Sequence, residues 1–553
     1  MEDATGAVQE FVEASSVEEA LRVIHRHTVL LTPVIDYSFA GQIQALQAFG
    51  YSVAPFLLAL RLNTLKRSQE VGIARLTRQD WGASDQGWLQ PLSLATANDR
   101  ARQLAFKANS SSDPTDLNGA IEAWREVLHH PAIGDAPGNL RATHLNSLGE
   151  GLWGRFKTNG LRRDRDEARR LWLRAVKASP PSWYELPLYL LNLGEAIHEQ
   201  YRRGRRHSCL LSEIRLLRRA EDLIRESTSP HWPETGPYSR QSLLFRCEEE
   251  LGWALFSLYV EDRSRSELDQ AIQAFNAAVQ LAGSSVNGTT LGQLGLCLQE
   301  RYRWSGDQRD LEAAHGILQR SLQLLPPGSE LFYIDQSVLA SVLTDKYIES
   351  SDIHELDTGL ALARESLAGM QKHPERIGPA IADGLNSLGV GLREHFELYG
   401  DQRSLDEAID TIRRAVNSPY QRSSLLLTAN LAETLRVRYQ ATGSLENLEE
   451  TVQLLKAVEG LPGPTLDRVA VLTILGECLR ERARYRHGDD LSQAIDRGER
   501  ALAETPPEST LRPSVLWNLA CALGETRKPP DHKRAVQLLN EAFNGTPESS
   551  ATR

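Results

Sequence analysis

Apolar and polar residues follow a helical period along most of this chain, and the pattern itself recurs at long intervals. The clearest mark of each recurrence is a glycine or alanine that stands in the same helical frame nine times. Successive marks are 43 to 49 residues apart, except for one interval of 58. Self-similarity at a nearly fixed period indicates a repeat array, in which each unit buries its apolar face against its neighbours. The nine landmark residues are Gly149, Gly194, Gly252, Gly295, Ala340, Gly389, Ala432, Gly476 and Ala520.

Each landmark lies in the first of two expected helices. Apolar residues one before it and three after it, such as Leu148 and Leu152 around Gly149, share one helical face. Glycine inside a helix costs about 1 kcal/mol relative to alanine, so its repetition predicts a close approach of two helices there. An aromatic ring seven residues later predicts a buried seam two turns further on. Seven units have this ring: Phe156, Tyr201, Tyr259, Tyr302, Tyr347, Phe396 and Tyr439.

A second helix is expected about 20 residues after each landmark. It carries a leucine, an alanine and a β-branched residue at helical spacing, as at Leu405, Ala408 and Ile409. Acidic residues such as Asp406 stand near its start, where the helix dipole favours negative charge. Glycine-containing turns precede the second helix, and prolines separate one unit from the next. Each repeat is therefore a helical hairpin.

These features resemble the tetratricopeptide repeat, with Leu-Gly in the first helix, Ala in the second and Pro at the exit. The usual period of that repeat is about 34 residues, whereas the period here is 43–45 in most units. The excess lengthens the first helix by about two turns. The chain thus resembles a long-unit subfamily of tetratricopeptide proteins, often associated with caspase-like peptidases. The resemblance implies an all-α fold, a right-handed α-α superhelix.

Three parts of the chain are expected. Residues 1–95 do not follow the period and contain an amphipathic helix around 17–24, so they are interpreted as a helical leader or a cap on the first repeat. Residues 96–545 form an array of about ten helical pairs, because a degenerate pair around 101–124 precedes the nine landmarks. Residues 546–553 are expected to be a disordered tail.

Composition narrows the functional classes. The start of the chain lacks a basic segment followed by an apolar one, and the most apolar stretch, 53–60, is too short to span a bilayer, so a cytoplasmic protein is expected. Five scattered cysteines do not make a disulfide framework or a zinc site. Phosphate-loop, zinc-protease and nucleophile-elbow motifs are absent. No catalytic residue, metal or cofactor is therefore assigned.

In the resembled fold the first helices line a concave groove. Positions on that face are mostly acidic or asparagine, which predicts a basic or amphipathic protein segment as partner and disfavours nucleic acid. A solvated helix face with an ordinary excess of glutamate remains the alternative interpretation. The candidate groove residues are Asn192, Glu195, Glu199, Glu300, Asn430, Glu433, Arg436, Glu477, Arg480 and Asn518.

Charge is uneven along the chain, whose net charge is −11. Arginines cluster at two equivalent turns of neighbouring units, and stacked turns would join them into one patch. Such a patch would suit an anionic partner or self-association with the acidic remainder, although a solvated edge explains it equally. The patch residues are Arg162, Arg163, Arg202, Arg203, Arg205 and Arg206.

The long interval between Gly194 and Gly252 contains an insertion, 227–240, with several prolines and the rings of Trp232 and Tyr238. It is interpreted as a structured loop, either a connector or a functional element.

Two functions remain open. The first is a non-catalytic interaction scaffold or sensor that regulates a separately encoded effector, such as a caspase-like peptidase. The second is an unusual enzyme or small-molecule receptor, for example in a biosynthetic pathway, with a pocket where the leader or the insertion covers the groove.

Overall fold

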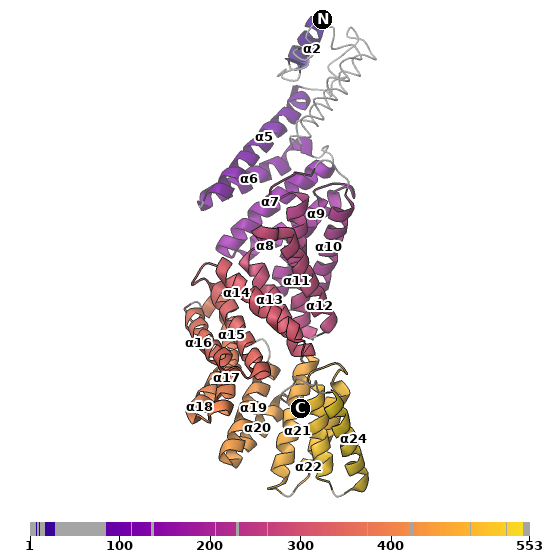
Figure 1. Cartoon of the computed structure of the whole chain (residues 1–553). Helices are drawn as coiled ribbons and strands as arrows, with labels where there is room; N and C mark the ends of the chain where they lie inside the picture. Colours follow the sequence, from indigo (N-terminus) through magenta and orange to yellow (C-terminus); the bar gives the residue numbers. More distant parts are fainter. Residues whose placement is uncertain are drawn as a thin grey trace. The chain divides into compact units, whose positions relative to one another are not determined.

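The structure is a computed structural model of the whole chain, and it describes residues 7, 10–11, 17–27, 85–111, 113–133, 138–204, 206–227, 232–262, 264–372, 374–419, 424–486, 488–526 and 528–545. The described residues contain helices and no strands. The fold is all-α, a superhelix of paired helices, as the sequence predicts (Figure 1). No described helix is long and apolar enough to cross a bilayer.

Ten helical pairs follow one another in the described part of the chain, after the isolated helix α2 (Val17–Arg26). The first helices are α5 (Asp85–Ser110), α7 (Gly138–Asn159), α9 (Leu186–Gly204), α11 (Arg240–Asp262), α13 (Gly288–Ser305), α15 (Glu330–Ser350), α17 (Pro374–Tyr399), α19 (Ser424–Thr442), α21 (Thr465–Ala483) and α23 (Arg512–Gly524). The second helices are α6 (Pro114–His129), α8 (Arg162–Ala178), α10 (His207–Glu226), α12 (Arg265–Ala282), α14 (Gln308–Leu324), α16 (Ile353–Met370), α18 (Gln402–Val416), α20 (Leu445–Val458), α22 (Asp490–Glu504) and α24 (Pro529–Gly545). Single 3₁₀ turns, η3 (Pro131–Ile133) and η4 (Gly283–Ser285), follow α6 and α12.

Packing follows the hairpin pattern. A first helix packs on its own second helix, as α7 does on α8 and α13 on α14. The second helix then packs on the first helix of the next pair, as α14 does on α15. First helices also touch one another along α13, α15, α17, α19, α21 and α23. The first helices from α13 to α23 therefore form one continuous layer, and we call the set of first helices in each part of the chain its inner layer.

The landmark glycines lie where the two helices of a pair cross. A Cβ on Gly149 would lie 2.6 Å from Nε1 of the buried Trp172, and one on Gly295 would lie 2.6 Å from Cγ of Leu318. In the unit of Ala340 the roles are exchanged, because a Cβ on Gly359 of the second helix would lie 3.0 Å from the Ala340 carbonyl oxygen. The predicted close approach is confirmed at these positions.

The turns between paired helices depend on a residue with positive φ. Gly306 and Gly400 adopt φ of 70° and 67°, and Ser351 adopts 58° in the unit that has no glycine there. The aspartate that follows caps the second helix: the Asp307 carboxylate accepts a hydrogen bond from the amide of Arg309 at 3.0 Å. This local chemistry reverses the chain within a few residues.

The chain divides into two compact units, Met1–Cys247 and Glu248–Arg553, with the boundary inside α11. We call them unit 1 and unit 2. The predicted division into leader, array and tail stays a prediction, because most of 1–84 and all of 546–553 lie outside the described residues.

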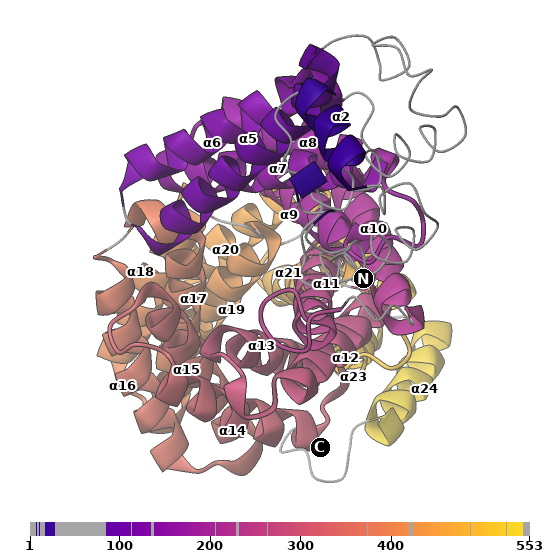
Figure 2. The same ribbon diagram turned by 90° about the horizontal axis from the view of Figure 1, so that it is seen from above.

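Within unit 2, the turn before α23 contacts the end of α13, which lies several helical pairs earlier in the chain. The hydroxyl of Thr510, in the turn before α23, donates to the Arg303 carbonyl at 2.7 Å, and its amide donates to the Trp304 carbonyl at 3.3 Å. Both carbonyls belong to the last turn of α13, which lacks partners within the helix. Figure 2 shows the first helices of unit 2 from α13 to α23 following one another around the coil. Thr510 thus joins two pairs that are 207 residues apart in sequence.

Candidate functional site

The inner layer of unit 2 is lined by ion pairs that run from one repeat to the next. Arg436 bonds Glu433 of its own helix at 2.6 Å and Glu477 of the next first helix at 3.2 Å. Arg480 reaches Glu525 in the same way at 2.8 Å. The predicted groove residues Glu433, Arg436, Glu477 and Arg480 therefore link adjacent repeats, and their role in a groove stays a prediction.

The remaining candidates in unit 2 occupy the same layer. Glu300 accepts a hydrogen bond from the Tyr259 hydroxyl at 2.9 Å and lies 3.5 Å from Arg303. Asn430 donates to the amide oxygen of Asn386 at 2.8 Å. Asn518 is partly exposed on α23. The structure places all of these candidates on first helices, as the repeat frame predicts.

Carboxylates outnumber guanidinium groups on this layer. At positions one, four, five and eight after the landmarks of α13 to α23, unit 2 has eight carboxylates, five arginines and one lysine, Lys528, a surplus of two negative charges. The carboxylates are Glu300, Asp345, Glu394, Glu397, Glu433, Glu477, Glu481 and Glu525, and the arginines are Arg303, Arg393, Arg436, Arg480 and Arg484.

The surplus perturbs individual groups. Burial raises the pKa of Glu397, and the neighbouring Glu394 carboxylate raises it further. Burial also raises the pKa of Glu477, and Glu433 adds to the effect. In both groups burial is the larger cause and a neighbouring carboxylate adds to it.

Unit 1 has a denser polar network. Glu195 accepts a hydrogen bond from Trp153 Nε1 at 2.9 Å and forms ion pairs with Lys157 at 2.7 Å and Arg246 at 3.1 Å. Burial acts to raise the pKa of Glu195, but these cations overcome it and the pKa lies below its usual value. Asn192 is only 4% exposed, so it lies beneath the groove surface rather than on it.

Two carboxylates of this network have no ion-pair partner among the described residues. Glu185 accepts hydrogen bonds from the hydroxyls of Thr143 at 2.8 Å, Tyr189 at 2.5 Å and Tyr184 at 3.1 Å. Glu150 accepts one from the Asn192 amide at 3.3 Å. Burial raises the pKa of Glu150, and the nearby Glu185 carboxylate contributes.

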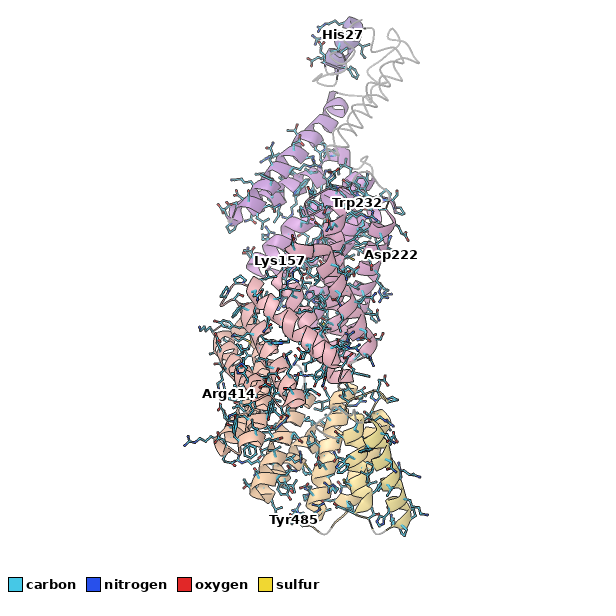
Figure 3. All side chains as sticks on the ribbon, viewed as in Figure 1. His27, Lys157, Asp222, Trp232, Arg414 and Tyr485 are labelled. Atoms are coloured by element: carbon cyan, nitrogen blue, oxygen red, sulfur yellow. The ribbon has the colours of Figure 1, made fainter. Side chains whose placement is uncertain are left out.

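The described part of the insertion packs against these carboxylates. Trp232 is labelled in Figure 3. Its ring meets the Tyr184 ring edge-on with centroids 6.0 Å apart, and the centroid of the Tyr184 ring lies 4.8 Å from that of the Trp183 ring. The negative charge of Glu150 raises the pKa of Tyr238 to about 12, and burial adds to the effect. The described part of the insertion, 232–240, therefore contacts the turn that precedes α9.

Two arginines of the predicted patch have partners within the chain. Arg202 and Arg203 form ion pairs with Glu199 at 3.5 and 2.6 Å, and Arg203 also lies over the Phe156 ring. Arg162 and Arg163 are exposed at the start of α8 and Arg206 is exposed before α10, whereas Arg205 lies outside the described residues. Whether an anionic partner binds here stays a prediction.

A cavity of about 530 Å³ lies in unit 2, between α16, α17 and α18. Its lining includes Ile381, Leu385, Asp410, Arg413 and Asn417. No group of three or more potential metal ligands occurs among the described residues.

A recurrent ion pair was not foreseen from the sequence. An arginine six residues after the landmark binds an aspartate at the start of its second helix through two nitrogens, as Arg155 does with Asp164 at 2.6 and 2.9 Å. Arg301 with Asp310 and Arg482 with Asp490 repeat the arrangement. The signal in the sequence was an arginine six residues after the landmark, followed eight or nine residues later by an aspartate.

Comparisons with known proteins add little. No protein-family model matches the sequence, and no curated protein matches it. Among solved structures, an assembly chaperone of RpL4, Acl4, is similar at a TM-score of 0.34 and 17% identity, over 57% of this chain and 99% of that one. Yeast Tom70 is similar at a TM-score of 0.31 and 14% identity, over 82% of this chain and 93% of that one. Similarities this weak support no inference about function, so the fold rests on the helical pairs themselves.

Proposed function

We propose that this chain is a non-catalytic scaffold that binds a basic segment of a protein partner along the inner layer of unit 2. The observation that supports the proposal most is the surplus of carboxylates on that layer. A lysine- or arginine-rich segment would neutralise the surplus and would be attracted to it over several ångströms.

The raised pKa values of Glu397 and Glu477 support the same partner chemistry. A cation beside these groups would lower their pKa values again, so binding would release repulsion that is present in the free protein. We further propose that the chain regulates a separately encoded effector, such as a caspase-like peptidase, in the cytoplasm.

Fluorescence anisotropy with a short labelled peptide that alternates lysine and serine tests the proposal. We expect binding that weakens as salt is added, and weakens further in the double variant Glu397→Gln, Glu481→Gln. The matched control is Asp357→Asn with Glu446→Gln, which removes two exposed charges from the second helices α16 and α20. Equal binding by the two double variants would contradict the proposal.

A small-molecule receptor is the second candidate, and the cavity beside Asp410 and Arg413 is the observation in its favour. Its volume falls in the range of ligand pockets. A screen of small anions and metabolites by thermal shift would support it if a hit loses its effect in Ile381→Trp, which fills the cavity.

A further inference from the structure

One triad in unit 1 shows how this protein places a cation between a ring and a carboxylate. The Lys157 ammonium lies 5.9 Å from the centre of the Trp153 ring and 2.7 Å from the Glu195 carboxylate. The Trp153 ring donates its own N–H to the same carboxylate. A cation over an aromatic face and next to a carboxylate gains from both interactions.

The region beside the described part of the insertion contains the ring and carboxylate components of such a triad. Neither carboxylate forms an ion pair among the described residues, although the Arg246 guanidinium acts on Glu150 electrostatically. Glu185 is surrounded by three hydroxyl donors, and Glu150 is contacted by an amide. Three aromatic rings lie beside them: Trp183 and Tyr184 stack close together, and Trp232 meets Tyr184 edge-on. The fold therefore supplies the carboxylates and the rings of such a triad, and a bound partner would supply the cation.

The rings are also accessible. Trp183, Tyr184 and Trp232 are each partly exposed, and the Tyr238 side chain is 49% exposed. A loop that only filled space over the inner layer would bury these rings. Half-exposed tryptophan and tyrosine are instead typical of surfaces that bind a partner.

We propose that this surface, formed by Glu150, Glu185, Tyr184 and Trp232, binds an arginine side chain of a protein partner. The inference rests on the proposed role in binding proteins, but it concerns unit 1 and names the residue that is recognised.

Arginine suits the surface better than lysine. Its flat guanidinium can lie on a tryptophan or tyrosine face and still direct several N–H groups at two carboxylates, whereas an ammonium is a compact and strongly hydrated charge. The chain itself places arginine over rings elsewhere, with Arg265 over Trp304 at 5.4 Å and Arg203 over Phe156 at 5.5 Å. The same contact supplied by a partner would complete the surface.

The test uses the full chain and three labelled peptides that differ only in the residue alternating with serine: arginine, lysine or the uncharged isostere citrulline. We expect the arginine peptide to bind several-fold more tightly than the lysine peptide, and the citrulline peptide to bind weakest. Glu185→Gln and Trp232→Leu should each weaken binding of the arginine peptide about tenfold and remove its advantage over lysine. Trp232→Phe should retain most of that advantage, because it keeps a ring.

Matched controls are Glu226→Gln on the exposed side of α10 and Trp517→Leu on α23, where the ring is 57% exposed. Equal affinity for arginine and lysine peptides, or an unchanged arginine advantage in Glu185→Gln and Trp232→Leu, would overturn the inference. Failure of the unit 2 proposal would look different, because Glu397→Gln with Glu481→Gln should weaken both charged peptides alike. The two proposals can therefore fail separately.

Discussion

Units 1 and 2 are built from the same helical pair but treat the inner carboxylates differently. In unit 2, Glu433 and Glu477 share the guanidinium of Arg436, and Glu525 bonds Arg480. In unit 1, Glu150 and Glu185 take hydroxyl and amide donors instead, beneath an aromatic loop. Glu195 of unit 1 is also paired across repeats, with Lys157, so the two units differ in Glu150 and Glu185, which form no ion pair among the described residues.

The comparison separates what the repeat requires from what it leaves open. Close helix crossings and the bidentate ion pair at the turn occur in both units, so they belong to the shared hairpin. The partners of the inner carboxylates differ between the two units, so we expect the units to differ in what they bind.

The largest expected effect concerns the shared ion pair. Arg155→Met and Arg301→Met each leave an aspartate, Asp164 or Asp310, that is buried without its cation. Each should destabilise its own pair by about 3 kcal/mol. Hydrogen exchange of α7–α8 and α13–α14 measures this loss of stability. Destabilisation by only one of the two substitutions would contradict the claim that the ion pair is a shared feature of the hairpin.

A pH effect is expected in unit 2 from one buried carboxyl. Burial raises the pKa of Asp335 to about 6, against about 4 in the unfolded chain, although the Ser321 hydroxyl donates to it at 2.5 Å. Because the folded state holds this proton more tightly, stability falls as the pH rises from about 4 to 6 and then stays lower, by up to about 3 kcal/mol. Asp335→Asn should remove that fall.

Urea unfolding of the wild type and Asp335→Asn at several pH values provides the measurement. The difference between the two proteins should grow between pH 4 and 6 and then remain constant. A difference that does not change with pH would show that Asp335 titrates normally in the folded protein.

A matched pair of glycines compares the two units in helix crossing. A Cβ on Gly295 would lie 2.6 Å from Leu318, whereas one on Gly194 would lie 3.4 Å from Leu217. Gly295→Ala should therefore cost about 1–2 kcal/mol, and Gly194→Ala should be neutral or stabilise by up to about 1 kcal/mol. Thermal melts of the two variants provide the measurement. Equal shifts of Tm from the wild type would show that the two crossings are equally tight.

The smallest effect concerns the contact that returns the coil of unit 2 to itself. Thr510→Val removes the hydroxyl that bonds the Arg303 carbonyl and should cost about 1 kcal/mol. Hydrogen exchange should rise in the last turn of α13 and stay unchanged in α7. Uniform exchange throughout the chain would mean that this contact does not constrain the coil.

Much of the fold followed from the sequence because it depends on local chemistry. The landmark glycines marked the helix crossings, and Gly306 and Gly400 marked the turns with positive φ. The return contact of Thr510 could not be foreseen, since it depends on the small rotation from one pair to the next summed over several pairs.

The candidate site was predicted less well, and for a physical reason. The repeat frame gave the helix face on which Glu195 and Glu433 lie, but it did not give the partners of their side chains. Those partners come from neighbouring repeats more than 40 residues away in several cases, as with Trp153 and Glu195. Glu185 was missed because it stands just before α9, outside the positions counted from the landmark.

The central claim is that a protein partner contacts the inner layer. Photo-crosslinking with the arginine–serine peptide, carrying a benzophenone group, tests it most directly when the attachment sites are mapped by mass spectrometry. We predict attachment to first helices and to the loop around Trp232 and Tyr238. Attachment confined to the second helices, such as α8, α16 and α20, would contradict the account.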